Sequence, residues 1–169
     1  VVVRNNNITA NERSGVVVWG KDRSPAIYNN SVSLNNDSGI GLGSGASPTI
    51  YNNTITSNLG DGICMGNATP IIRNNFITKN RAGIVSSDSS PAILNNTITS
   101  NRGEGIISKR GSPTVSNNVI TSNLGAGVAC IDQSSPTIQS NNVSQNNGDG
   151  VSVGVNCSPT IYNNTITSN

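Results

Sequence analysis

The chain of 169 residues predicts an all-β fold, a parallel β-helix in which the backbone winds through a stack of short coils. Residues 47–58 recur without a change at 158–169, and partial copies lie between them. The second Asn of an Asn-Asn pair in this segment returns at intervals of 24, 23, 22, 21, 22, 23 and 23 residues. Only 33% of residues are hydrophobic, but Ile, Val and Thr are abundant, which favours thin layers over a single round core or a disordered chain.

Each period predicts three short strands separated by turns. Ser-Pro precedes an alternating run such as Thr49-Ile50-Tyr51, because Pro lacks an N–H and suits the start of a strand. The first Asn of the pair tolerates a left-handed backbone, so we expect it to form a corner. The second strand follows at Thr54-Ile55-Thr56 with its Ile inward. After a turn at residues 58–61, the third strand opens behind a glycine, as at Gly62-Ile63.

Stacked coils, about 4.8 Å apart, place like side chains on like. Ile50 is expected over Ile27 and under Ile72, and Ile55 over Val32 and under Ile77, so that aliphatic columns form the core. A stacked side-chain amide can donate to one neighbour and accept from the other, so we interpret the second Asn of each pair as a structural ladder rather than a ligand site. The ladder comprises Asn6, Asn30, Asn53, Asn75, Asn96, Asn118, Asn141 and Asn164. A second row comprises Asn11, Asn35, Asn58, Asn80, Asn101, Asn123, Asn146 and Asn169.

The pattern Ser-Pro-x-Ile-x-Asn-Asn-x-Ile-x-x-Asn-x-Gly-x-Gly-Ile resembles the right-handed parallel β-helix repeat of the pectin lyase-like superfamily. It is most similar to the repeats of NosD-type periplasmic proteins and of carbohydrate-binding and sugar-hydrolase β-helix domains. The resemblance covers residues 1–169 and implies one right-handed solenoid of about seven coils of 21–24 residues, with three strands per coil. The superfamily includes lyases, hydrolases, epimerases and non-catalytic surface proteins, so the resemblance implies a fold rather than an activity.

The chain begins inside a predicted strand, Val1–Val3, and ends inside a repeat. No signal peptide, membrane-spanning apolar run or terminal cap is recognisable. We therefore expect a single β-helix domain, 1–169, cut from a longer extracellular, cell-surface or periplasmic protein. Uncapped coils would also permit end-to-end self-association.

Three cysteines and the absence of His argue against a metal site or a cofactor. By strand alternation Cys64 points outward, Cys130 points inward and Cys157 lies in a turn. Cys64 and Cys130 are separated by three coils, about 14 Å, and Cys157 lies at another point of the circuit, so no disulfide is expected. The net charge of +2, without a basic stripe interleaved with aromatic residues, argues against nucleic-acid binding.

The densest charged region supplies the candidate catalytic residues of a polysaccharide lyase, hydrolase or epimerase. These candidates are Arg81, Arg102, Glu104 and Lys109. We prefer surface ion pairing as the interpretation of this region, and a weak contact with an anionic glycan is the alternative. Asp61, Glu104 and Asp149 share the slot before the third strand, with about 10 Å between neighbours along the axis. This spacing would just admit an inverting carboxylate pair, but we prefer to interpret these acids as solvated turn formers next to glycine.

Tyr28, Tyr51 and Tyr162 are candidate sugar-stacking residues, which we expect to be exposed and scattered along the axis. Without a convergent catalytic cluster, the sequence favours a non-catalytic extracellular scaffold or spacer with a carbohydrate-contacting face. Its expected partner is a polysaccharide or a cell-surface glycan. Two alternatives stay open: a polysaccharide lyase, hydrolase or epimerase, and a filament or surface-array protein.

Overall fold

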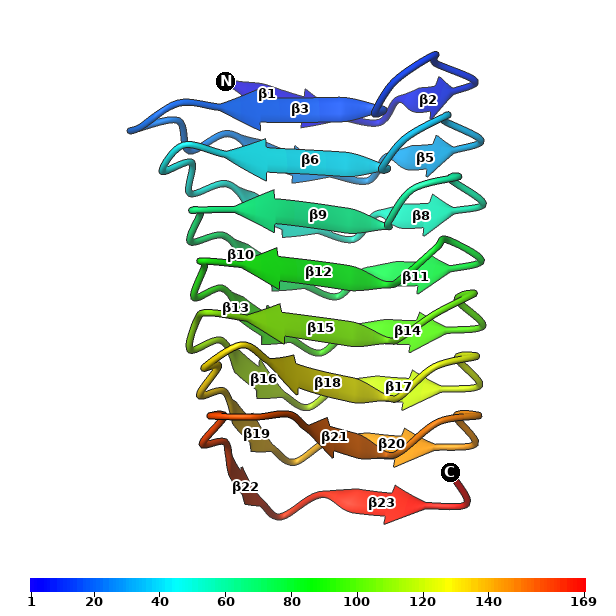
Figure 1. Cartoon of the computed structure of the whole chain (residues 1–169). Coiled ribbons are helices and arrows are strands. Elements are labelled where there is room, and N and C mark those ends of the chain that lie inside the picture. Colours follow the sequence, from blue (N-terminus) through cyan, green and yellow to red (C-terminus); the bar gives the residue numbers. More distant parts are fainter.

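The computed structural model describes all 169 residues as one parallel β-solenoid with three strands in each coil and no helix (Figure 1). The strands form three parallel sheets, two of eight strands and one of seven, in which each strand pairs with its counterparts one coil above and below. The predicted fold class and repeat are therefore confirmed. No helix of the structure is long and apolar enough to span a lipid bilayer.

Sheet A holds the strands that follow the Ser-Pro turns: β1 (Val2–Arg4), β4 (Ala26–Tyr28), β7 (Thr49–Tyr51), β10 (Ile71–Arg73), β13 (Ala92–Leu94), β16 (Thr114–Ser116), β19 (Thr137–Gln139) and β22 (Thr160–Tyr162). Sheet B holds the strands that follow the Asn pairs: β2 (Asn7–Thr9), β5 (Ser31–Ser33), β8 (Thr54–Thr56), β11 (Phe76–Thr78), β14 (Thr97–Thr99), β17 (Val119–Thr121), β20 (Asn142–Ser144) and β23 (Thr165–Thr167). Sheet C holds the strands behind the glycines: β3 (Val16–Trp19), β6 (Ile40–Gly43), β9 (Ile63–Gly66), β12 (Ile84–Ser87), β15 (Ile106–Lys109), β18 (Val128–Ile131) and β21 (Val151–Val153).

The core is a continuous column of aliphatic side chains along the axis. Ile50 pairs with Ile27 on one side and Ile72 on the other, as the repeat predicts. The central residue of each sheet A and sheet B strand is fully buried over most of the stack, and 23 buried residues form one apolar cluster. Since flanking residues of the same strands face solvent, the alternation of the sequence reports directly which side chains are inside.

The corner between sheets A and B forms at the first Asn of each pair, which adopts a left-handed backbone. Asn52 has a φ of 54°, and Ser140, which occupies this slot in one coil, has a φ of 55°. The second Asn builds the predicted ladder: Asn53 Nδ2 donates to Asn75 Oδ1 at 3.0 Å, and the pattern repeats in successive coils. The second Asn row forms an equivalent ladder, as in Asn58 to Asn80 at 2.9 Å.

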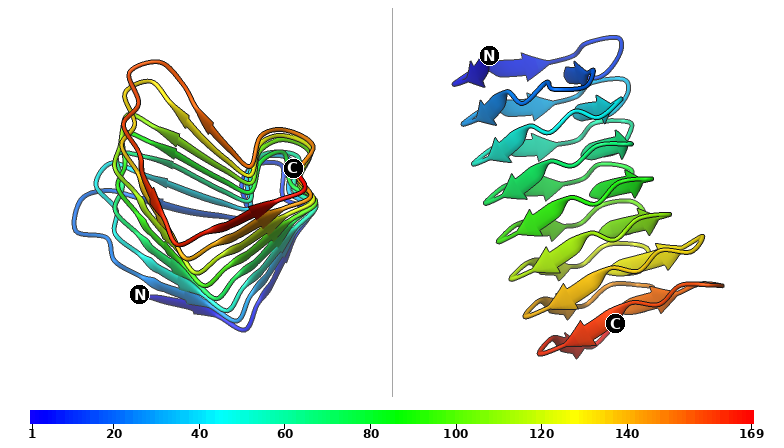
Figure 2. Two further views of the ribbon diagram at one scale, coloured as in Figure 1. Left: turned by 90° about the horizontal axis from the view of Figure 1, so that it is seen from below. Right: turned by 90° about the vertical axis from the view of Figure 1, so that its left-hand side faces the viewer.

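The second ladder has a left-handed corner of its own, which the sequence did not predict. The residue before each of its Asn residues has a positive φ, including Leu34 at 56° and Lys79 at 58°. Neither Leu nor Lys favours a left-handed backbone, so the residue types at this corner do not predict the left-handed conformation. Beyond this corner the turns between sheets B and C rise beside the outer face of sheet C, which gives the cross-section a concave side (Figure 2, left).

Candidate functional site

A cavity of about 260 Å³ lies on this concave side, in the first three coils. Its floor comes from β3, β6 and β9, and its wall comes from the turns that precede β3 and β6. We call it the sheet C groove. It is lined by Ser14, Val17, Trp19, Asp37, Ser38, Gly41, Leu42 and Cys64.

Trp19 is the largest exposed apolar side chain of the groove, with 69% of its surface accessible. It ends β3, directly opposite Gly43 in the next coil. The indole ring lies against the backbone of Gly43, where an added Cβ would collide with it. Glycine at this position therefore lets an aromatic ring lie along the sheet, with much of its surface free for stacking.

Asp37 supplies the polar wall of the groove in the turn before β6, at the opposite end of the strands from Trp19. Its exposed carboxylate accepts a hydrogen bond from Ser14 Oγ at 3.0 Å and another from Ser38 Oγ at 3.5 Å. A carboxylate has more acceptor sites than these two bonds occupy, so it can also accept from a ligand hydroxyl.

Cys64 lines the groove on its C-terminal side, and the buried Asp61 lies next to it. Both carboxylate oxygens of the buried Asp61 are engaged by Arg81, from Nε at 2.9 Å and Nη2 at 2.7 Å, and the N–H of Ala82 adds a third bond at 3.2 Å. Burial, and then the charge of Asp61, raise the pKa of the Cys64 thiol, so this thiol stays protonated at neutral pH. The Cys64 thiol is therefore not an activated nucleophile.

The charged candidates from the sequence fall into two separate places. Arg81, Arg102 and Glu104 all lie in turns between sheets B and C. Arg81 pairs with Asp61, whereas Arg102 Nη2 donates to the carbonyl oxygens of Asn58 and Leu59 at 2.9 and 3.1 Å.

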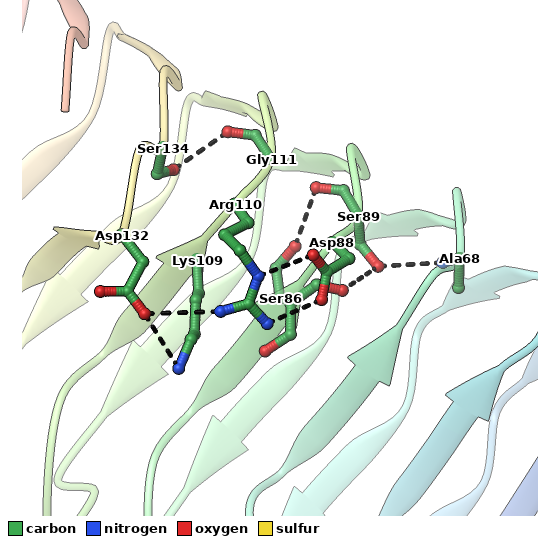
Figure 3. A network of polar contacts seen from close by, with 10 residues as sticks. Ala68, Ser86, Asp88, Ser89, Lys109, Arg110, Gly111, Asp132 and Ser134 are labelled. Atoms are coloured by element: carbon green, nitrogen blue, oxygen red, sulfur yellow. Dashed lines mark hydrogen bonds and ion pairs between the residues drawn. The ribbon is translucent and has the colours of Figure 1, made fainter. Parts of the chain in front are cut away.

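Lys109 lies at the other end of sheet C, in an exposed ion-pair network (Figure 3). Its Nζ lies 3.0 Å from Asp132, while Arg110 binds both oxygens of Asp88 at 2.8 and 2.9 Å. The hydrogen bond from Arg110 lowers the pKa of Asp88 below its usual range. The structure thus does not bring Lys109 together with Glu104, although the two belong to one coil. No group of three or more His, Cys, Asp or Glu side chains converges on a metal position.

The tyrosine candidates lie on the outer face of sheet A, and the expected scatter is wrong for two of them. Tyr28 and Tyr51 occupy one slot in neighbouring coils and stack with ring centroids 4.7 Å apart and an interplanar angle of 12°. Arg73 covers Tyr51 at 4.4 Å from the ring centroid, so both rings are half-buried. Tyr162 is separate and is hydrogen-bonded to Gln139.

Trp19, Asp37 and Gly43 were not predicted from the sequence. One signal was available: the only Trp of the chain stands one coil before its most glycine-rich stretch, residues 39–45. Aromatic residues on an outward slot opposite glycine are typical of a ring that lies flat on a sheet.

Comparisons with known proteins agree with this architecture. The family model described as a right-handed β-helix region matches residues 1–120 and 107–169. Two crystal structures of mutant forms of the periplasmic alginate epimerase AlgG superpose with TM-scores of 0.90 and 0.85, at 20% and 21% identity, over 98% of this chain and 45% of each of those chains. The A-module of the mannuronan C-5 epimerase AlgE6 from Azotobacter vinelandii superposes with a TM-score of 0.64 at 16% identity, over 98% of this chain and 56% of that chain. At these identities the likeness shows the fold, and this chain spans about half the length of the structures that it matches. No curated protein sequence gives a significant match.

Proposed function

Because the chain belongs to the right-handed β-helix family, we propose that it is a polysaccharide-binding segment of an extracellular or periplasmic protein. The proposed binding site is the sheet C groove, where a sugar ring stacks on the free surface of Trp19. One observation carries the proposal: a 69% exposed indole is held on the glycine floor of a cavity that also presents a carboxylate.

The groove has the two elements that sugar recognition requires. The indole offers an apolar surface for the C–H face of a pyranose, and Asp37, further along the groove, offers acceptors for hydroxyl groups of the same saccharide chain. A charge-assisted hydrogen bond of this kind contributes about 1.5–3 kcal/mol. The wall carries the free carboxylate of Asp37, whereas Arg81 is already paired with Asp61. The groove therefore favours a neutral, hydroxyl-rich chain over a polyuronate, which Asp37 would repel.

Trp19 is also the reporter for the test, because it is the only Trp of the chain. Titration with soluble mannan, xylan and β-glucan, and with polymannuronate as the anionic comparison, should change its fluorescence with at least one neutral polymer. Trp19→Ala should abolish binding in affinity electrophoresis, and Asp37→Asn should weaken it about tenfold.

Two glycine variants provide a matched pair. Gly43→Ala places a methyl group against the Trp19 ring and should displace it, whereas Gly66→Ala lies in the same slot one coil further with no atom within 4 Å. We expect the first variant to lose affinity and the second to keep it, with equal far-UV spectra. Equal binding by Trp19→Ala and the unmodified protein would exclude this groove as the site.

A polysaccharide-modifying enzyme is the second candidate, and the alginate epimerases among the similar structures are the observation that favours it. Arg81, Arg102 and Glu104, which share one edge of sheet C, would be its reactive groups, with Lys109 contributing only to substrate contact. Incubation with polymannuronate, followed by ¹H NMR for epimerised or unsaturated residues and a reducing-end assay, tests this possibility. Turnover that survives in both Arg102→Gln and Glu104→Gln would remove these residues from any catalytic role.

A further inference from the structure

Cys130 and Cys157 lie in adjacent coils near the C-terminal end. Cys130 is fully buried in β18, and Cys157 lies half-buried in the turn between β21 and β22. Cys157 packs against the apolar core cluster that contains Cys130. The order of strands and turns along the chain puts the two thiols at different points of the circuit, but turn and strand approach each other there across neighbouring coils. Their different points on the circuit therefore do not by themselves keep the two thiols apart.

The register identifies the equivalent pair one coil earlier. Cys130 pairs with Ser108 in the neighbouring strand of sheet C. Cys157 is in register with Ser134 of the preceding coil, because the N–H of Ser158 donates to the carbonyl oxygen of Ser134 at 3.1 Å. The Cys130 and Cys157 positions are therefore the Ser108 and Ser134 positions moved along the axis by one coil.

The serine pair shows how closely these two positions approach. Ser108 Oγ and Ser134 Oγ are 2.5 Å apart and both are buried. Side chains in such contact have Cβ atoms near the separation of about 3.5–4.5 Å that a disulfide requires. The turns from Cys130 to Ser134 and from Val153 to Cys157 have equal length, so the stacking carries this geometry into the next coil.

From this register we infer that Cys130 and Cys157 form a disulfide when the protein is in an oxidising compartment, linking the turn before β22 to β18. Cys64 is not a competitor, since it faces outward between Gly41 and Val85. The inference stands independently of saccharide binding, because the pair lies at the opposite end of the stack from Trp19.

The reaction is a thiol–disulfide exchange with a small disulfide such as oxidised glutathione. The more exposed Cys157 thiolate attacks one glutathione sulfur, forming a mixed disulfide and releasing one glutathione thiolate. Cys130 then loses its proton and attacks the Cys157 sulfur, which expels the second glutathione. Both thiols are free in the structure, and Cys157 Sγ contacts the carbonyl of Val155 at 3.7 Å, so a rotation about its Cα–Cβ bond must bring the sulfur inward.

Cleavage before aspartate separates the three cysteines, because residues 61–87, 88–131 and 149–169 become different peptides. The reduced protein is incubated with oxidised glutathione, blocked with an alkylating agent, cleaved and analysed by mass spectrometry. We expect one linked species of 88–131 with 149–169, lacking two hydrogen atoms, while 61–87 is alkylated. Its formation should persist in Cys64→Ser and vanish in Cys130→Ser.

A double variant, Ser108→Cys with Ser134→Cys on a cysteine-free background, serves as the positive control for the geometry. The linked protein should also melt about 5 °C above Cys130→Ser. If the double variant links while Cys130 and Cys157 carry only separate glutathiones, or if Cys64 forms the only bridge, the inference is wrong.

Discussion

A single buried amide in the middle of the first ladder tests how the coils hold together. Asn96 Nδ2 donates to the carbonyl oxygens of Ile72 and Leu94 at 3.0 and 3.1 Å and to Asn118 Oδ1 at 3.0 Å. Its Oδ1 accepts from the N–H and from Nδ2 of Asn75, both at 3.0 Å. Asn96→Asp keeps the shape and the two accepted bonds, but it replaces two N–H donors, shared among three acceptors, with an oxygen that faces three oxygens.

The expected loss is about 2 kcal/mol of unfolding free energy for the two lost N–H donors, at about 1 kcal/mol each. Ionisation adds to this loss. Burial and the three facing oxygens raise the pKa of the introduced carboxyl, and the two donors of Asn75 offset only part of that rise. Every tenfold weakening of the folded-state acid relative to the unfolded one adds about 1.4 kcal/mol at pH values above the folded-state pKa. The folded form then binds more protons than the unfolded form, so the deficit is smallest below the usual Asp pKa and grows as the pH rises, until it levels off above the raised pKa.

Urea denaturation followed by circular dichroism at pH 4 and pH 8 measures this deficit against the unmodified chain. Asn95→Asp is the matched control: the neighbouring Asn95 is exposed, has a φ of 55° and makes no side-chain hydrogen bond within the chain. Because Asp tolerates this backbone, the control should change stability by less than about 0.5 kcal/mol. Equal stability of the two variants at pH 8 would refute the view that the ladder amides stabilise the stack.

Three further predictions concern the second corner, the thiols and the core. Leu34→Gly should stabilise the protein by about 1 kcal/mol in denaturant unfolding, because Leu34 has a φ of 56°; Leu59→Gly, at an exposed turn without positive φ, should not stabilise it. Burial raises the pKa of Cys130 to about 11, so at pH 8 iodoacetamide should label Cys157 in the reduced protein while Cys130 stays unmodified, and its labelling should accelerate as the pH approaches 11. Ile98→Ala, at a fully buried position of β14, should cost about 2–5 kcal/mol of unfolding free energy.

Each of these predictions has a contrary result. Equal shifts for the two leucine variants would show that the left-handed corner carries no strain. Simultaneous labelling of both thiols at pH 8 would show that the coils near β18 open readily. A loss below about 1 kcal/mol for Ile98→Ala would show that the column repacks around the missing atoms.

The fold could be predicted because stacking requires the same residue types at equivalent positions of every coil. The corner before Asn53 selects Asn, and the column at Ile50 selects a β-branched residue, so both leave a period in the sequence. The second corner could not be predicted, since the Asn58 ladder closes it whatever residue precedes, as Lys79 shows.

The groove could not be predicted for a different reason. Its depth depends on how far the turn around Asp37 rises beside sheet C. The spacing of repeated residues in the sequence gives no information about that distance. The contact of Tyr28 with Tyr51 could have been predicted from the sequence, because each residue directly precedes an Asn pair and the two occupy the same position in neighbouring coils. The separation of Lys109 from Glu104 could also have been predicted, because a whole strand of sheet C lies between them.

The two Asn ladders also give the stack a direction. Every ladder amide donates through Nδ2 to the Oδ1 of the coil that follows it, from Asn6 to Asn30 and onward to the C-terminal end. The amide dipoles of a row therefore align and polarise one another, in the manner of the peptide dipoles of an α-helix. One end of each row ends in an oxygen and the other in an amide nitrogen, so any coil or partner that extends the stack must join head to tail. The ladders thus select orientation as well as register, which a purely aliphatic column would leave free.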